Sequence, residues 1–276
     1  MRASLSVMRW QLGTWRGNVR IVLAFSVCAV ASLFRMTALK ESAAVGGDPL
    51  QMLEPFIYNS TDRFVNTLMF LGLLLLLADA PFTEQSATYS LVRSSRLQWV
   101  TGKLMYILLS CGIYYAFSLA VTVLMVSLDS FSGNAWSAPF YDVLNSGNVN
   151  AFYLYVEGGS FVKEMSPYSA AFYAFLLELG YGFFCGSLLF LLNLSGSRVL
   201  GFTVLSSQHI FGYLFNWRYF PFVISIFDRH SFEVGDIYPT LTFSVAYFCL
   251  LSAVTAVCIF AAMRRVDLRI TVGTRI

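Results

Sequence analysis

Four polar side chains fall inside otherwise apolar stretches of the 276-residue sequence, and they are the best candidates for contacting a bound molecule. They are Glu178, Asn193, Gln208 and His209. Polar groups are costly in hydrocarbon, so they face the interior of a helix bundle or a water-filled path. We interpret all four as candidates for lining a substrate path. The alternative is hydrogen bonding between helices, which is favoured for the three uncharged residues, whereas for Glu178 both interpretations stay open.

The remaining reactive residues predict no catalytic, metal or nucleotide site in this chain. The only Gly-Lys pair, Gly102-Lys103, lacks the earlier glycine and the following Ser or Thr of a phosphate-binding loop. His209 and His230 belong to no metal-binding motif, and the role of His230 stays open. Without paired spacing, the cysteines are expected to be small buried residues; they are Cys28, Cys111, Cys185, Cys249 and Cys258.

The composition indicates a protein whose surface faces lipid. Hydrophobic residues make up 57% of the chain and charged residues only 12%, about half the charged share of a soluble domain. We therefore predict an all-α polytopic membrane protein that forms a single transmembrane domain over residues 1–276, with membrane lipid as a partner. A net charge of +3 gives no support for a nucleic-acid partner.

Six segments approach the length of about 20 mostly apolar residues that a membrane helix needs. The predicted spans are 21–39, 64–80, 104–128, 168–194, 199–217 and 238–263. Before them, residues 1–20 place arginines on one helical face and apolar residues on another, which predicts an amphipathic helix in the headgroup layer.

Two segments between the spans are expected to carry short structure of their own. The loop 129–167 is too long to be structureless in a compact domain, so we expect a short helix there. The region 218–237 contains an apolar run too short to span, and it fits a re-entrant or interfacial piece.

The positions of Lys and Arg predict that both termini are cytoplasmic. With this orientation most of the basic residues lie on the cytoplasmic side, as the positive-inside rule requires. Segments 129–167 and 218–237 are then extracytoplasmic, and 81–103 is a cytoplasmic loop. The cytoplasmic basic residues are Arg2, Arg9, Arg16, Arg20, Arg93, Arg96, Lys103, Arg198, Arg264, Arg265, Arg269 and Arg275.

The loop 81–103 is longer than a simple connection requires. Asp79 and Pro81 are a helix-start signal, and residues 84–91 can then form a short helix that the sequence 93–96 ends. A helix with an acidic start and a basic end suggests a docking surface for a partner.

The same segment resembles the coupling region of the permease subunits of type-2 ABC exporters. In that family a short apolar span leads into Phe, Glu, a small residue with Thr, Leu, a Ser/Arg-rich turn and a Gly-Lys pair. Ala87 stands where glycine is usual. The matching positions are Phe82, Glu84, Ala87-Thr88, Leu91, Ser94-Ser95-Arg96 and Gly102-Lys103.

The resemblance implies an exporter permease that is not itself an enzyme. A separate cytoplasmic subunit would bind ATP and Mg²⁺, and it would dock on a coupling helix in 81–103. A second permease subunit, identical or a sister chain, would complete the path, and the implied location is a bacterial plasma membrane. The residues implied to contact the ATP-binding partner are Phe82, Glu84, Thr88, Tyr89, Leu91, Arg93 and Arg96.

The alternative function is a membrane-embedded sensor or immunity protein that binds a partner through the same cytoplasmic loop without transporting. The residues do not choose among a lipid, an amphipathic peptide or a hydrophobic drug as the substrate.

Overall fold

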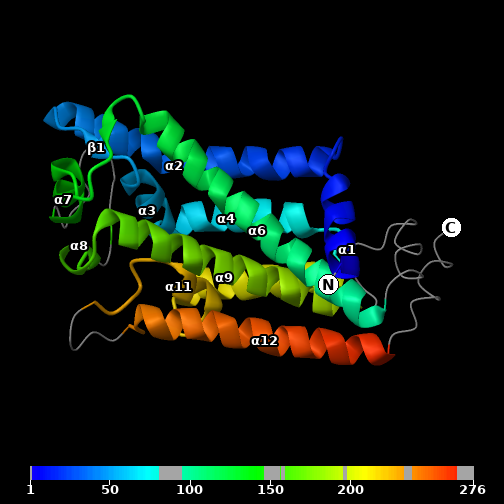
Figure 1. Cartoon of the computed structure of the whole chain (residues 1–276). Coiled ribbons are helices and arrows are strands. Elements are labelled where there is room, and N and C mark those ends of the chain that lie inside the picture. The colour runs from blue at the N-terminus through cyan, green and yellow to red at the C-terminus, as the bar shows by residue number, and fades with distance from the viewer. Residues whose placement is uncertain are drawn as a thin grey trace.

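Four long apolar helices dominate the computed structural model of this chain, which describes residues 2–80, 95–145, 156, 159–194, 198–232 and 238–265 (Figure 1). They are α2 (Val19–Gly46), α6 (Arg96–Val126), α9 (Pro167–Leu194) and α12 (Leu241–Arg265). Within the described ranges, these four are long and apolar enough to cross a membrane individually. The chain is therefore an all-α membrane protein, as predicted.

The two other predicted spans correspond to shorter helices. Residues 64–80 mostly form α4 (Arg63–Leu77), and the preceding α3 (Glu54–Thr61) meets it at 89°. Counted as one bent element, this pair would be a fifth span. The prediction for 199–217 corresponds to α10 (Arg198–Phe215), which is apolar but short.

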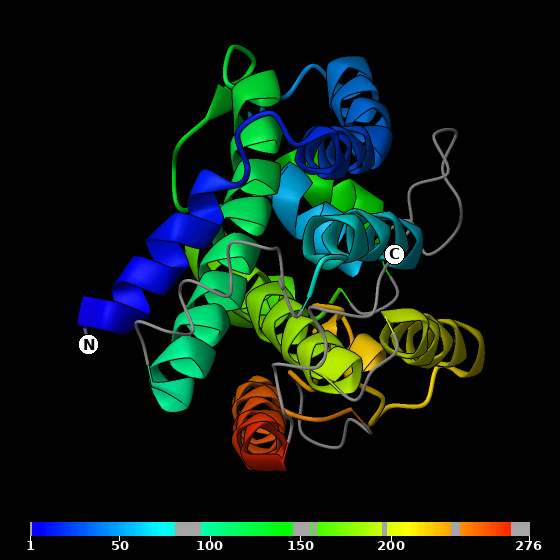
Figure 2. The ribbon, with the colours of Figure 1, turned by 90° about the vertical axis from the view of Figure 1, so that its right-hand side faces the viewer.

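The long helices run side by side, with α9 at the centre of the bundle. Helix α9 contacts α4, α6, α10 and α12, while α2 packs on α4 and α6. Figure 2 views the bundle end-on, with α10 and α12 at its periphery. We call the two ends of the bundle the α1 end and the α7 end, after the short helices found there in Figure 1.

Helix α1 (Arg2–Gly13) lies across the α1 end, roughly perpendicular to the bundle, and packs on α6 (Figure 1). It is shorter than the predicted 1–20 helix, because the chain turns after Gly13 and Gly17 adopts a positive φ of 76°. Asn18 then caps α2 by accepting a hydrogen bond from Arg20 N. A turn therefore separates α1 from the first long helix.

The start of the third predicted span requires a correction. We expected residues 93–96 to end a helix and the span to begin at 104, but α6 begins at Arg96. Ser95 and Gln98 form a reciprocal capping box that starts this helix. The predicted loop 81–103 therefore loses its last eight residues to α6.

Short elements occupy the α7 end, and they include the helix expected in 129–167. Strands β1 (Leu50–Gln51) and β2 (Ser130–Phe131) pair in parallel, with Leu50 opposite Ser130. Helices α7 (Ala138–Asn145) and α8 (Phe161–Glu164) follow. Glu54 is buried, and its carboxylate accepts hydrogen bonds from Gln51 N, Ser137 N and Ser137 Oγ, which fastens α3 to this layer.

The apolar run in 218–237 contains α11 (Pro221–Ser225), in keeping with the predicted non-spanning piece. Every residue from 222 to 230 is buried. Phe227 N donates to Ser60 O at 3.2 Å, so this segment meets α3 inside the bundle.

His230 lies in the loop that follows α11, outside the long helices, and is 2% exposed. Its Nδ1 is 3.0 Å from Phe227 O and its Nε2 is 2.9 Å from Ser244 Oγ of α12. Burial lowers the pKa of His230 from 6.5 to about 4. The neutral ring thus ties the loop to the start of α12.

We expect His230 to make the stability of the fold depend on pH. Its stabilising contribution is complete above pH 6.5 and is lost as the pH falls toward about 4, because the unfolded chain takes up the proton first. The total loss is roughly 3 kcal/mol. Thermal unfolding of the purified protein should show a lower midpoint at about pH 5 than at pH 7. In His230→Asn the pH dependence should be smaller, and equal pH dependence in both proteins would contradict the assignment.

Candidate functional site

The first part of the candidate site is the pair of chain segments that flank residues 81–94, at the α1 end. Six predicted partner-binding residues lie outside the described residues; they are Phe82, Glu84, Thr88, Tyr89, Leu91 and Arg93. The chain before them is held twice. Asp79 forms an ion pair with Arg20 at the start of α2, and Ala80 O accepts a hydrogen bond from Asn193 Nδ2 of α9 at 2.7 Å.

The chain after this segment is anchored to a different helix. Arg96, the one predicted partner-binding residue that is described, donates from Nη1 to Met263 O of α12 at 3.2 Å. The two flanks of 81–94 are therefore attached to α2, α9 and α12. A force applied to this segment would reach each of these helices.

The Gly-Lys pair at 102–103 forms the contact between α6 and α1. A Cβ at Gly102 would lie 2.7 Å from Ser4 O, so the two backbones approach too closely for any side chain. Lys103 is buried, donates to Gln11 Oε1 and lies over the ring of Trp99 at 5.3 Å. Its ammonium is also 5.6 Å from the ring of Trp10. Cation–π contacts and a charge-assisted hydrogen bond thus hold a desolvated cation.

Sequence reasoning missed Gln11, which is buried between the two helices. We predicted an amphipathic helix in the headgroup layer over residues 1–20, and the residues buried most deeply in α1 are Ser4, Val7 and Gln11. The available signal was a polar residue one α-helical turn after Val7, on the side of the helix that faces away from the arginines.

The second part of the candidate site is a polar junction inside the bundle. His209 of α10 is 2% exposed. Its Nδ1 lies 2.9 Å from Tyr181 Oη of α9, and its Nε2 lies 3.1 Å from Thr67 Oγ1 of α4. The ring stacks on Phe70, with 4.0 Å between centroids and 7° between planes. One side chain therefore links three helices.

The four residues predicted to line a substrate path differ in their location in the bundle and in their hydrogen bonds. Glu178 is 5% exposed, and its Oε2 atom has no hydrogen-bond partner among the described residues. It lies one turn before Tyr181 on α9, near the junction. Gln208 precedes His209, and its side-chain amide interacts with Tyr181 of the same junction. Asn193 instead lies at the α1 end, where it anchors Ala80.

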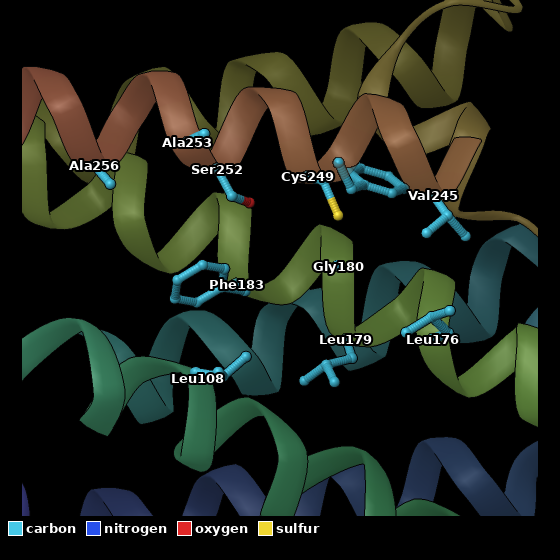
Figure 3. Close-up of a pocket in the computed structure, with 11 residues that line it drawn as sticks. Leu108, Leu176, Leu179, Gly180, Phe183, Val245, Cys249, Ser252, Ala253 and Ala256 are labelled. Atoms are coloured by element: carbon cyan, nitrogen blue, oxygen red, sulfur yellow. The ribbon is translucent and has the colours of Figure 1, made fainter. Parts of the chain in front are cut away.

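An apolar groove runs between α6, α9 and α12, as Figure 3 shows. Its volume is about 420 Å³. One wall belongs to α12, where Phe248 is followed by smaller residues, and the other belongs to α9, where Gly180 lies between Leu179 and Phe183. The residues that Figure 3 labels include Leu179, Gly180, Phe183, Cys249, Ser252 and Ala253.

The five cysteines differ in exposure, which corrects the expectation that all are buried. Cys28, Cys111 and Cys185 are buried, whereas Cys249 and Cys258 of α12 are exposed. In the folded, detergent-solubilised protein we expect a small neutral maleimide to modify Cys249 and Cys258 faster than the three buried thiols, and all five should react after unfolding. Mass spectrometry of the labelled peptides would assign the sites, and rapid labelling of Cys111 in the folded protein would contradict the packing of α6 on α9.

The geometry thus combines the bonded flanks of residues 81–94, at the α1 end, with a buried polar junction nearer the middle of the bundle. Comparisons of the chain with protein-family models, with curated proteins and with solved structures found no match.

Proposed function

We propose that this chain is the membrane-spanning permease subunit of an ATP-driven exporter, of the type-2 ABC kind that residues 82–103 resemble. The α3–α4 pair is its second span and α10 its fifth, which gives six. The α1 end faces the cytoplasm of a bacterial cell, and the protein resides in the plasma membrane. This orientation is supported by the basic residues Arg9, Arg16 and Arg264, which are exposed at that end.

The observation that carries the proposal is the anchoring of both flanks of residues 81–94. A loop that only connected α4 to α6 would need no attachment to other helices. Here Asp79, Ala80 and Arg96 bond to α2, α9 and α12. A partner that moves the segment would therefore move several spans together, which is what coupling requires.

The His209 junction extends this route into the bundle. A displacement of α4 at its α1 end would move Thr67. The hydrogen bonds of His209 would then transmit this movement to Tyr181 of α9. Glu178 lies one turn before Tyr181 on α9, and its buried Oε2 has no hydrogen-bond partner among the described residues, so a substrate that reached it could bond to it. In this proposal ATP and Mg²⁺ belong to the docked partner, and a second permease subunit completes the path.

The proposal is tested by capturing the partner and then weakening the anchor. A photo-crosslinking residue in place of Tyr89, introduced in native membranes, should capture an ATP-binding subunit. Arg96→Gln should reduce substrate-stimulated ATP hydrolysis by about tenfold or more while the protein remains folded, because a lost charged hydrogen bond is worth roughly 1.5–3 kcal/mol.

Arg264→Gln is the matched control, because Arg264 is an exposed cation at the same end of α12, next to Met263. Hydrolysis in that variant should stay at the wild-type rate. Capture of a partner without ATPase activity, by intact folded protein, would overturn the permease proposal and favour the sensor.

A further inference from the structure

A second cavity lies where the turn after α1 meets α2 and α6, and its lining combines a cation with hydrocarbon. Its volume is about 550 Å³. Trp15 and Arg16 belong to the turn, Phe117 comes from α6, and the remaining lining residues belong to α2: Ile21, Val22, Phe25, Ser26 and Ala29.

The cation stands at one end of this cavity. Arg16 is exposed, and no ion pair involves it among the described residues. The neighbouring Arg20 is neutralised by Asp79, so the two cations are not equivalent. The guanidinium of Arg16 therefore provides a charge at the mouth of the cavity that no described residue pairs with. A phosphate group would complement it with bidentate hydrogen bonds.

The rest of the cavity forms an apolar furrow along the first turns of α2. The lining residues of α2 from Ile21 to Ala29 lie on one face of the helix, and they extend for about 12 Å at 1.5 Å per residue. The rings of Phe25 and Phe117 meet edge-to-face at 5.1 Å between centroids. Trp15 is fixed beside them, because its Nε1 donates to Tyr106 Oη at 2.9 Å.

We propose that this cavity binds one anionic phospholipid, with its phosphate on Arg16 and an acyl chain in the furrow on α2. The placement supports this occupant. Helix α1 lies across the end of the bundle, so the turn that follows it is at the level of lipid headgroups (Figure 1). From that level α2 enters the hydrocarbon layer, so an acyl chain that enters the membrane beside it would run along the furrow. The bound lipid would fill the angle between α1 and α2.

The test compares lipid retention in two matched arginine variants. The protein is placed in nanodiscs that contain equal amounts of dioleoyl phosphatidylglycerol and dioleoyl phosphatidylcholine, then extracted with mild detergent and analysed by native mass spectrometry. We expect one phosphatidylglycerol per chain, retained with about fivefold preference. Arg16→Gln should abolish that preference. Arg9→Gln should preserve it, because Arg9 is an exposed cation of α1 outside the cavity.

Two further measurements separate a lipid site from weaker explanations. Ala29→Phe should fill the furrow and remove the retained lipid with Arg16 still present, while the thermal unfolding of the delipidated protein stays unchanged. Glycerol 3-phosphate should displace the lipid poorly, since it lacks the chain. Equal losses in Arg9→Gln and Arg16→Gln, or efficient displacement by glycerol 3-phosphate, would overturn the proposal.

Discussion

Replacing Gly102 by leucine is expected to push α1 off α6 and to lower the thermal unfolding midpoint by roughly 5 °C. A Cβ at this position would lie 2.7 Å from Ser4 O and 2.8 Å from Val7 Cβ, and the first of these atoms is backbone. The new side chain cannot be accommodated by a rotamer change in α1. Overpacking of this kind costs about 1–3 kcal/mol, which is a shift of a few degrees per kcal/mol in a chain of this size.

The displacement should also expose the residues that Gly102 brings together. Lys103 would lose Gln11 as an acceptor, and Trp15 would separate from Tyr106. Limited proteolysis of the purified protein should then cut within residues 1–18 much faster than in the wild type. This readout distinguishes detachment of α1 from a general loss of stability.

Gly112→Leu is the control, because Gly112 lies on the same helix and a Cβ there meets no atom within 4 Å. Its unfolding midpoint and its proteolysis pattern should match those of the wild type. Equal effects of the two substitutions would show that helix α6, and not the crossing with α1, responds to the loss of glycine.

The sequence predicts those helices of the fold whose boundaries follow from hydropathy alone. Residues 168–194 are predominantly apolar, and α9 occupies almost the same range. Prediction fails where side chains at the end of a helix determine that the chain bends there. Asp62 caps α4 by accepting hydrogen bonds from Phe64 N and Val65 N, and Asn66 Nδ2 donates to Ser60 O across the bend. A window average over 64–80 cannot detect such a break, although the capping residue is present in the sequence.

The candidate site could likewise be predicted only in part. The cost of burying a polar group in lipid was enough to select Glu178 and His209 as residues of the bundle interior. It could not reveal which helices meet there, because Thr67 and Tyr181 are unremarkable in sequence and lie 142 and 28 residues from His209. Asn193 shows that the criterion also selects residues outside the polar junction. It satisfied the same criterion, yet its partner is the backbone of Ala80, a contact that depends on where α4 ends.

His209→Leu is expected to uncouple α4 from α9, with a loss of about 1–3 kcal/mol in stability and, under the proposed function, at least a tenfold loss of export. The substitution removes both hydrogen bonds of the imidazole and its stacking on Phe70. Tyr181 Oη then loses its imidazole partner in a dry interior, where an unpaired hydroxyl is costly, whereas Thr67 Oγ1 keeps its hydrogen bond to Arg63 O. Thermal unfolding and transport into vesicles would measure the two effects.

A double-mutant cycle with Tyr181→Phe separates the junction from simple packing. In the wild-type background Tyr181→Phe removes one bond and should cost part of the full loss, since interhelical hydrogen bonds in membranes average about 0.6 kcal/mol. In the His209→Leu background it should cost nothing or restore stability, because the phenol has already lost its partner. Equal costs in both backgrounds would mean that the two residues act independently. Coupling of the two in transport as well as in stability would identify this junction as the point where movement of α4 reaches the residues around Glu178.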